Sequence, residues 1–387
     1  MRKKIFGIKK RSGLGKISNS LSSSALKKPD YYLIGVIFVI AIFGLVMLSS
    51  ASSIESFRRF GNAYQIFCSQ FLKGFLPGII LFFFFFKVDY KHWEKFSVPF
   101  FIISVILLIL VFIPGIRAGY GTAKRWINIA GVNFQPAEVV KLFLILSFSG
   151  WLSYRGTEAN RNFWNGLMPF LFFLGIVSGL IILQPDIGTL AAIIVISLCI
   201  FFVAGGRLSH IFGVGLLGLG ALAILIIRAR YRLARLTTFF QPDFDPQGIG
   251  YHINNAILAI GSGGWLGLGF GQSRQKFAYL PEVIGDSIFA VIAEELGFIF
   301  SALLIILFLF LAWRGFLLAK NTSSDYARLI TVGIISWFVF QAFFNIAAMV
   351  ALMPLTGIPL PFISYGGTSL AVSLAAAGIL ANISRHT

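Results

Sequence analysis

Apolar stretches of about 20 residues recur along most of this chain, and this is the length that a helix needs to cross a bilayer. The chain is 57% hydrophobic and only 12% charged, whereas soluble domains carry about 25% charged residues. Because lipid offers the backbone no hydrogen-bond partner, each stretch is expected to cross as a helix. The sequence therefore predicts an all-α integral membrane protein with ten transmembrane helices, at roughly residues 31–50, 65–86, 97–114, 136–153, 167–183, 188–205, 209–228, 286–313, 327–351 and 365–384.

Basic residues predict the orientation of these spans. Nine of the 32 Lys and Arg residues precede Tyr31, so residues 1–30 are expected to form a basic cytoplasmic tail. Over all loops, the side of the N-terminus holds 19 Lys and Arg residues against 11 on the other side. Residues 31–384 thus form a membrane domain with both termini cytoplasmic, and residues 229–285 form a large extracytoplasmic loop between helices 7 and 8.

Charge and composition also limit the kinds of ligand. The net charge of +18 does not indicate a nucleic-acid partner, because much of it lies in the tail, where it suits anionic lipid. The two cysteines lie in apolar segments and the four histidines are scattered singly. No disulfide framework or metal-ligand spacing can be read from this pattern, so the sequence leaves any metal ligands unknown.

Carboxylates stand at the point where the long loop enters the eighth span. Glu282 and Asp286 directly precede this apolar run, and an ionisable group at the edge of hydrocarbon is a functional hypothesis by default. The same loop carries Arg235, Arg274 and Lys276. A basic surface beside a carboxylate at a membrane face suits a lipid-linked phosphate substrate.

Two further motifs place an acid near a proline at the start of a span, Gln-Pro-Ala-Glu at 135–138 and Gln-Pro-Asp at 184–186. A proline is tolerated where a helix opens, and the helix dipole favours an acid in the first turn. For Asp186, helix capping and a functional role are equally well supported. Glu138 has Lys141 on the same helical face, which favours a functional cleft over a purely structural ion pair.

Glu294 and Glu295 lie inside the eighth span, where a structural ion pair is the favoured interpretation. Successive helical positions differ by about 100°, so the two side chains are not expected to share a face. Lys73 or Lys141 is the expected partner of at least one of them. The glycine-rich segment 261–271, which includes Ser262, follows no strand and is not a nucleotide loop. Its glycines, like those after Ser364, are expected to let backbone pack closely at membrane depth.

Several of these motifs, in this order, resemble the SEDS family (shape, elongation, division and sporulation) of bacterial peptidoglycan polymerases. The similarity runs from about residue 31 to 383. The sequence is more similar to the division type of this family than to the elongation type. The motifs are Gln-Pro-Ala-Glu at 135–138 with Lys141, Gln-Pro-Asp at 184–186, Ala-Ile-Gly-Ser-Gly-Gly at 259–264, Ser-Arg-Gln-Lys at 273–276, Tyr-Leu-Pro-Glu at 279–282, Glu-Glu-Leu-Gly at 294–297 and Leu-Pro-Phe-Ile-Ser-Tyr-Gly-Gly at 360–367. One departure is clear: the family usually has Thr, commonly preceded by His, before the acid, whereas Asp286 follows Ile284 and Gly285.

The resemblance implies a glycosyltransferase that polymerises lipid II, the undecaprenyl-pyrophosphate-linked disaccharide-peptide, at the outer face of the membrane. Asp286 is the expected general base, because the acceptor hydroxyl must lose a proton. The leaving pyrophosphate needs cations, and a divalent ion (Mg²⁺ or Mn²⁺) could share this task. The expected substrate-binding residues are Glu138, Lys141, Arg125, Arg235, Ser262, Arg274, Lys276, Glu282 and Ser364.

The resemblance also implies partners and leaves two alternatives. A class B penicillin-binding transpeptidase is expected, together with other membrane proteins of the division complex, and the place of action would be the division septum. The main alternative is a flippase for the lipid-linked precursor, since Glu138, Lys141 and Glu295 could equally line a translocation path. The second alternative is a non-catalytic division scaffold.

Overall fold

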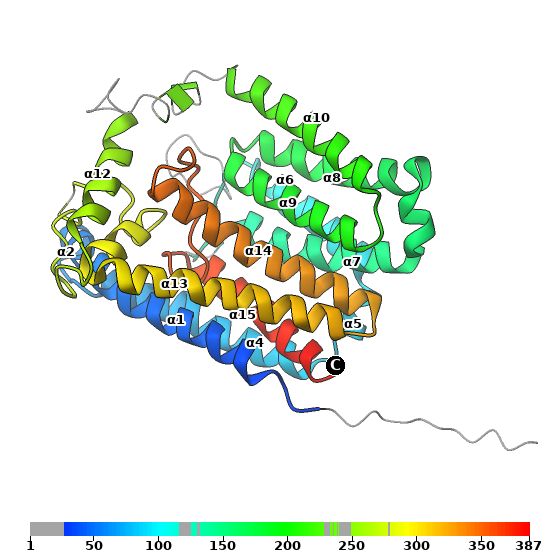
Figure 1. Cartoon of the computed structure of the whole chain (residues 1–387), viewed down its shortest axis with the longest axis horizontal. Coiled ribbons are helices and arrows are strands. Elements are labelled where there is room, and N and C mark those ends of the chain that lie inside the picture. Colours follow the sequence, from blue (N-terminus) through cyan, green and yellow to red (C-terminus); the bar gives the residue numbers. More distant parts are fainter. Residues whose placement is uncertain are drawn as a thin grey trace, which may run out of the picture.

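The computed structural model describes residues 27–115, 125–129, 132–227, 233–234, 236–237, 239, 249–277 and 279–387. Almost all regular structure in these residues is helical, and the long helices run side by side as one bundle (Figure 1). The helices are α1 (Tyr31–Ala51), α2 (Ser53–Phe60), α3 (Gln65–Gln70), the π-helical turn η1 (Phe71–Phe75), α4 (Leu76–Lys87), α5 (Lys91–Glu94), α6 (Ser97–Leu110), α7 (Pro136–Arg161), the π-helical turn η2 (Phe163–Leu167), α8 (Met168–Ile182), α9 (Ile187–Val203), α10 (Leu208–Ile227), α12 (Ile249–Ser262), α13 (Ile288–Asn321), α14 (Asp325–Met349) and α15 (Gly367–Ser384).

Length and composition make seven of the described helical segments able to cross a membrane. They are Tyr31–Ala51, Gln65–Lys87, Pro136–Arg161, Phe163–Ile182, Ile288–Asn321, Asp325–Met349 and Gly367–Ser384. Three shorter apolar helices, Ser97–Leu110, Ile187–Val203 and Leu208–Ala221, fall on the third, sixth and seventh predicted spans. A multi-pass helical membrane protein is therefore confirmed, and the count of ten stays a prediction.

Two elements depart from the predicted pattern. A small antiparallel hairpin joins β1 (Ile127–Ile129) to β2 (Val132–Phe134), so the fold is not purely helical. The segment predicted as a loop at 229–285 contains a helix, α12. The apolar residues of α12 are interleaved with Asn and Gly, and such a helix has no continuous 20-residue apolar run by which to recognise it.

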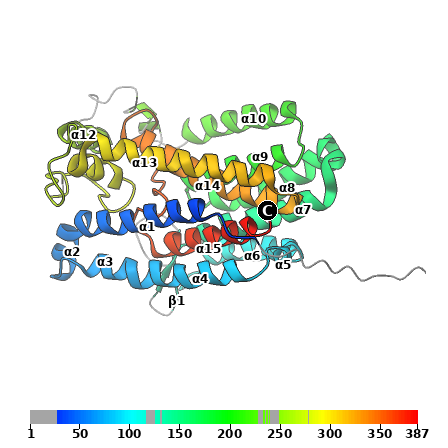
Figure 2. The same cartoon turned by 60° about the horizontal axis from the view of Figure 1, so that its bottom comes forward.

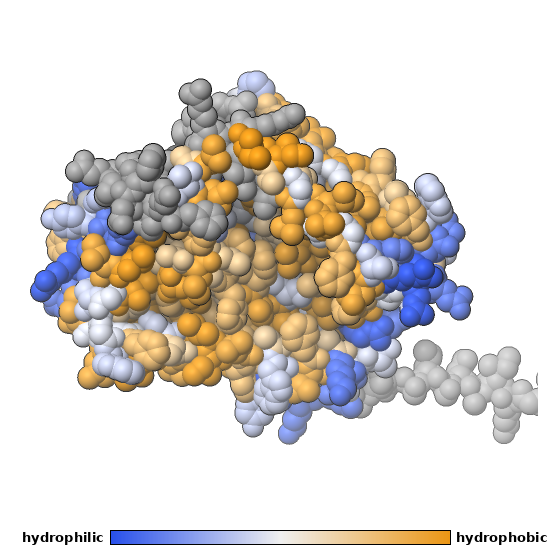
Figure 3. Space-filling view, turned by 45° about the horizontal axis from the view of Figure 1, so that its top comes forward, coloured by the Kyte–Doolittle hydropathy of each residue, from blue (hydrophilic) through white to orange (hydrophobic). Residues whose placement is uncertain are grey.

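Apolar side chains face both the bundle interior and its outside. Helices α7, α14 and α15 have mostly buried surfaces, whereas α4 and α13 expose much of theirs. In Figure 3, hydrophobic residues cover the middle of the visible face and hydrophilic residues gather toward its two ends. This pattern is what a protein surrounded by lipid requires, because its outer surface need not be polar.

The two ends of the described chain meet at one end of the bundle, and α2 and α12 lie at the other (Figures 1 and 2). Lys27 donates its backbone N–H to Arg385 O at 2.9 Å. Asp30 caps α1 through Leu33 N and also forms an ion pair with Arg314 at 2.7 Å. Helix α12 of the long loop is therefore on the opposite side from both ends of the described chain, as the predicted topology requires.

Helix α1 packs directly on the backbone that leads into α15. A Cβ atom on Gly44 would lie 2.6 Å from Phe362 O and 2.7 Å from Ile363 Cα, whereas a Cβ on Gly35 of the same helix would meet nothing within 4 Å. We expect Gly44→Ala to destabilise the protein by about 1–3 kcal/mol through overpacking. Gly35→Ala should be neutral or slightly stabilising, because alanine is the better helix former. Thermal unfolding in detergent measures both, and equal melting temperatures would contradict this packing.

Candidate active site

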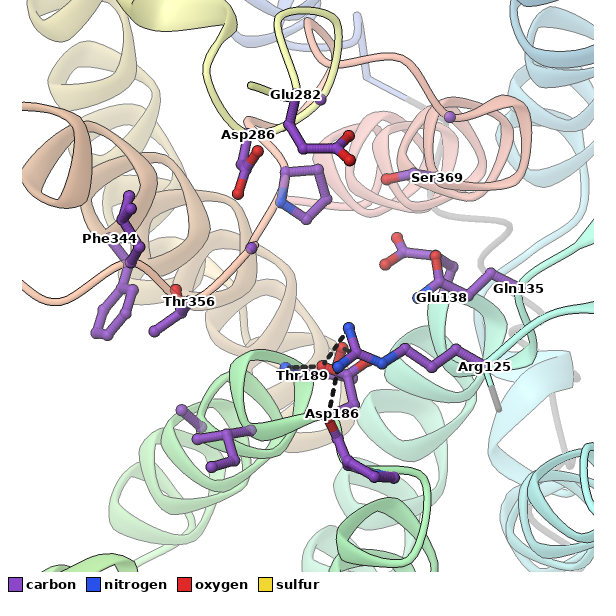
Figure 4. A pocket seen from close by; sticks show the side chains of 18 of the residues that line it. Arg125, Gln135, Glu138, Asp186, Thr189, Glu282, Asp286, Phe344, Thr356 and Ser369 are labelled. Atoms are coloured by element: carbon purple, nitrogen blue, oxygen red, sulfur yellow. Dashed lines mark hydrogen bonds and ion pairs between the residues drawn. The ribbon is translucent and has the colours of Figure 1, made fainter. Parts of the chain in front are cut away.

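One cavity of about 600 Å³ collects residues that are up to 244 positions apart in the sequence, from Arg125 to Ser369. It lies among the starts of α7, α9, α13 and α15 (Figure 4). Asp286 and Glu282 lie on one side of it, and Arg125 and Asp186 lie on the opposite side. The lining consists of Arg125, Trp126, Gln135, Glu138, Pro185, Asp186, Ile187, Thr189, Ala191, Leu236, Glu282, Gly285, Asp286, Phe344, Pro354, Leu355, Thr356, Gly357, Pro359, Tyr365, Gly366 and Ser369.

Asp286 belongs to a tight turn that directly precedes α13. Gly285 N and Ser287 N both donate to Glu282 O, at 2.9 and 3.2 Å. Glu282 has a φ of +48°, a left-handed conformation that a non-glycine residue adopts only where its surroundings impose it. The turn thus presents two carboxylates, those of Glu282 and Asp286, to the cavity.

Neighbouring segments hold the backbone of this turn. Ser364 Oγ donates to Gly285 O at 2.7 Å, and Tyr365 N donates to Ile284 O at 2.8 Å. Ser364, predicted as substrate-binding, is buried and does not appear in the cavity lining. The glycine-rich segment before α15 therefore supports Asp286 through the backbone.

Asn345 of α14 holds the same turn from another side. Its amide Nδ2 donates to Asp286 O and to Ile358 O, both at 2.8 Å. It joins the turn at 282–287 to the 354–359 segment of the cavity wall. A side-chain amide that bonds two separate backbone segments fixes their relative position.

Asp186 both caps a helix and lines the cavity. Its carboxylate accepts from Thr189 N at 3.1 Å and from Thr189 Oγ1 at 2.9 Å. It also lies 3.7 Å from the Arg125 guanidinium. The prediction of an acid inside the first turn was wrong for Asp186, because α9 begins at Ile187 and Asp186 is its N-cap. Helix capping and a functional role, the two interpretations left open for Asp186, are therefore compatible with each other.

Glu138 and Lys141 form a fully buried ion pair in the first turns of α7, with 2.8 Å between Lys141 Nζ and Glu138 Oε1. Lys141 also contacts Gln341 Oε1 at 3.3 Å and lies over the Trp337 ring at 4.9 Å. Trp337 Nε1 donates to the same Gln341 oxygen. Only Glu138 of this group lines the cavity, so the lysine lies behind it and holds it in place.

The described lining is acidic. It contains the four carboxylates of Glu138, Asp186, Glu282 and Asp286, and its one cation among the described residues is Arg125. Arg235 was predicted to bind phosphate and lies outside the described residues, although Leu236 next to it lines the cavity. Among the described residues, this lining therefore offers a phosphate substrate a single cation, Arg125.

Arg274 and Lys276 do not appear in the lining of this cavity. Arg274 is exposed. Lys276 borders a neighbouring cavity of about 420 Å³ beside α2, which shares Glu282 with the first one. Ser262 is likewise outside the lining, and its hydroxyl donates to Ala259 O within α12.

Lys276 is the partner of Glu295, so the expectation of Lys73 or Lys141 was wrong. Its ammonium lies 3.0 Å from Glu295 Oε1 and also donates to Gly271 O at 2.6 Å. Ser50 Oγ of α1 donates to the same carboxylate at 2.7 Å. The charge of Glu295 is thus compensated at the bundle edge by a residue of the long loop.

Glu294 and Glu295 both bond the same loop segment, although successive helical positions point about 100° apart. Glu294 accepts from Arg274 N at 2.9 Å and from the Ser273 hydroxyl, while Glu295 accepts from Gly271 N at 3.0 Å. Both carboxylates reach one loop segment, 271–276, because this segment crosses over the helix and covers two adjacent positions.

The glycine-rich segment packs backbone against backbone where α13 is interrupted. Gly297 has a φ of +76°, and the helical hydrogen bonds around it are replaced by bonds to the loop. Leu268 N donates to Glu294 O at 3.0 Å, and Phe298 N donates to Gly264 O at 2.9 Å. The predicted close backbone packing is confirmed, and its reason is that buried backbone groups need partners. Its depth in the membrane stays a prediction.

Sequence reasoning missed Gln341 and Asn345, which contact Lys141 and the Asp286 turn. A signal for both was present. They are polar, lie four residues apart on one face of an apolar span, and such residues in a membrane helix point to function. Trp337 continues the same face one turn earlier.

The described residues contain no group of three or more His, Cys, Asp and Glu side chains that could hold a metal ion. The carboxylates of the cavity stand apart on its walls rather than converging (Figure 4). A resident metal cage therefore does not fit the described lining.

Lys276 is expected to act mainly through stability. Lys276→Met should leave Glu295 buried without a cation, which costs about 3–5 kcal/mol. Lys276→Met with Glu295→Met should recover most of this loss, because both charges are then removed. Arg274→Met is the matched control, since Arg274 is exposed in the same loop and its loss should change stability by less than about 1 kcal/mol. Thermal unfolding in detergent distinguishes these outcomes, and a stable single variant would contradict the ion pair.

Comparisons with known proteins agree with this architecture. A family model described as "Cell cycle protein", which covers FtsW, RodA and SpoVE, matches residues 30–387. Stage V sporulation protein E of Bacillus subtilis (strain 168) is 38% identical over 362 residues, which cover 93% of this chain and 98% of that protein. The protein named probable peptidoglycan glycosyltransferase FtsW of Trichlorobacter lovleyi is 37% identical, over 93% of this chain and 95% of that protein.

Solved structures show the same fold. A chain from work described as "Structural coordination of polymerization and crosslinking by a peptidoglycan synthase complex" has a TM-score of 0.75 at 27% identity, covering 92% of this chain and 98% of that chain. The rod shape determining protein RodA of Thermus thermophilus has a TM-score of 0.68 at 27% identity, covering 92% and 97%. Because the family model matches nearly the whole chain, this multi-pass membrane protein belongs to the FtsW/RodA/SpoVE family, which is the SEDS family.

Proposed function

We propose that this protein is a peptidoglycan glycosyltransferase that polymerises lipid II at the outer face of the bacterial plasma membrane. The observation that carries the proposal is one cavity lined by Arg125 and by Glu138, Asp186 and Asp286, three acids from distant motifs. Relatives that share 34–38% of the sequence over nearly the whole chain support the activity, because several are named as probable peptidoglycan glycosyltransferases.

The reaction joins C1 of a donor MurNAc to the 4-hydroxyl of an acceptor GlcNAc. Asp286 accepts the proton of that hydroxyl as the new C1–O bond forms, and the C1–O bond to the pyrophosphate breaks to release undecaprenyl pyrophosphate. Asp286 suits this role because it lines the cavity and its turn is held from two neighbouring segments. A general base of this kind contributes about 10²–10⁴-fold in rate.

The remaining residues of the cavity bind and orient. Arg125 lies across the cavity from Asp286 (Figure 4), and it is the described cation best placed for the departing pyrophosphate. Arg235 is proposed to add a second cation. A divalent ion, Mg²⁺ or Mn²⁺, would then arrive with the pyrophosphate rather than in a protein cage. Glu138 and Glu282 are proposed to contact sugar hydroxyls. Substrate binding also stays proposed for four residues that do not line this cavity, where it would need contacts elsewhere: Arg274, Lys276, Ser262 and Ser364.

The setting of the enzyme follows the predicted topology. We place both termini in the cytoplasm, count ten spans, and locate the long loop and the cavity outside. The proposed partner is a class B penicillin-binding transpeptidase, since a chain of this fold was solved in work on coordinated polymerization and crosslinking. Division-complex membrane proteins and the septum are proposed on the similarity to proteins named FtsW.

Removing the proposed base should abolish polymerisation without unfolding the protein. We expect Asp286→Asn and Asp286→Ala to lower the rate of glycan formation from purified lipid II by about 10²-fold or more. Asp325→Asn is the matched control, because Asp325 is an exposed acid at the start of α14. If both Asp286 variants keep more than a tenth of the wild-type rate, the base is another residue, with Glu138 and Glu282 next in line. Flipping of labelled lipid II by wild type without any polymer would favour the flippase instead.

Cysteine labelling should place the long loop outside the cell. In a background with Cys68 and Cys199 replaced by serine, Gln272→Cys in the exposed part of the loop should react with an impermeant thiol reagent in intact cells. Asn321→Cys, exposed at the end of α13, should react only after the membrane is opened. The reverse pattern would place the loop in the cytoplasm and overturn the topology together with the proposed site of action.

A further inference from the structure

Helix α12 touches the catalytic turn through a histidine. His252 Nε2 lies 2.6 Å from the hydroxyl of Ser287, the residue that directly follows Asp286. Ser287 is fully buried, and it is the N-cap residue of α13. A short hydrogen bond to a buried hydroxyl is a specific contact rather than a surface encounter.

The second bond of Ser287 decides which atom donates. Ser287 Oγ donates to Pro281 O at 2.7 Å, and a carbonyl oxygen can only accept. The single hydroxyl proton is therefore used in this bond, so the imidazole Nε2 must carry the proton that it shares with Ser287. A ring nitrogen that donates cannot act as a base toward that hydroxyl. The pair is therefore not a nucleophilic Ser–His dyad, in spite of its distance.

The pair of His252 and Ser287 holds the turn that carries Asp286. Two hydrogen bonds of Ser287, from its Oγ to Pro281 O and from its N to Glu282 O at 3.2 Å, join the end of the turn to its start. Within it, Glu282 keeps its left-handed backbone, and Ile284 and Gly285 bring no polar side chain of their own. Such a conformation persists only where surrounding contacts over-determine it.

We propose that His252 is a positioning residue that ties α12 to the catalytic turn through Ser287 and so sets the orientation of the Asp286 carboxylate. This rests on the proposed function, in which Asp286 is the base. The long loop then has a role in the reaction, because one of its helices supplies a side chain that supports the turn. A base misplaced by about 1 Å can cost about 10²-fold in rate.

Kinetics of lipid II polymerisation tests this role with four variants of the pair and one control variant. His252→Ala and Ser287→Ala should each lower kcat by roughly 10- to 100-fold, with KM changed less than about twofold. The double variant should be no slower than the slower single one, because both remove one contact. Ser287→Thr keeps the hydroxyl and should retain most of the rate. His92→Ala, at an exposed histidine near the other end of the bundle, is the control and should match wild type.

Amide hydrogen exchange of the segment 279–288 measures the same contact without substrate. His252→Ala should raise exchange at Gly285 and Ser287, whose N–H groups bond inside the turn, and leave exchange in α15 unchanged. Unchanged exchange, or rate losses that add in the double variant, would overturn the proposal. If exchange rises but wild-type protein forms no glycan, the contact stands and the proposed function fails. If His252→Ala slows an Asp286→Asn protein further, His252 acts on something other than Asp286.

Discussion

The buried ion pair between Lys276 and Glu295 connects the long loop to the bundle, and the position of the site depends on it. Glu295 lies just before the point at Gly297 where α13 is interrupted, and the loop supplies both its cation and the hydrogen bonds of the interrupted backbone. A carboxylate left without a cation in this position would be strongly destabilising. The loop is therefore bound to α13 at Lys276, shortly before the chain reaches Asp286.

The cavity lies where α7, α9, α13 and α15 begin. Polar side chains are most easily accommodated at helix starts, where N–H groups without helical partners donate hydrogen bonds to acids, as Thr189 N does to Asp186. In the membrane interior the same side chains would need partners of their own, which is what Lys141 provides for Glu138. Function and membrane insertion thus both require that the polar side chains at these positions have hydrogen-bond or charge partners.

The turn at 282–287 is held by several hydrogen bonds rather than by one strong contact. Ser364 and Asn345 bond its backbone from two other parts of the chain, and Ser287 at its end bonds back to Pro281 O. Each bond contributes about 1 kcal/mol, yet together they restrict a turn that contains a left-handed glutamate. This arrangement resembles preorganisation in enzymes, where a reacting group is held before substrate binds.

The sequence alone determined which segments are apolar helices and which acids stand at their starts, because both follow from composition over one or two turns. It could not supply α12, whose short mixed pattern carries no membrane signal, nor the choice of Lys276 over Lys73 and Lys141 as the partner of Glu295. Only the tertiary structure brought Arg125, Glu138, Asp186 and Asp286 to one cavity. The physical reason is that pairing between distant charges depends on how helices pack and where loops return, and no local pattern contains that information.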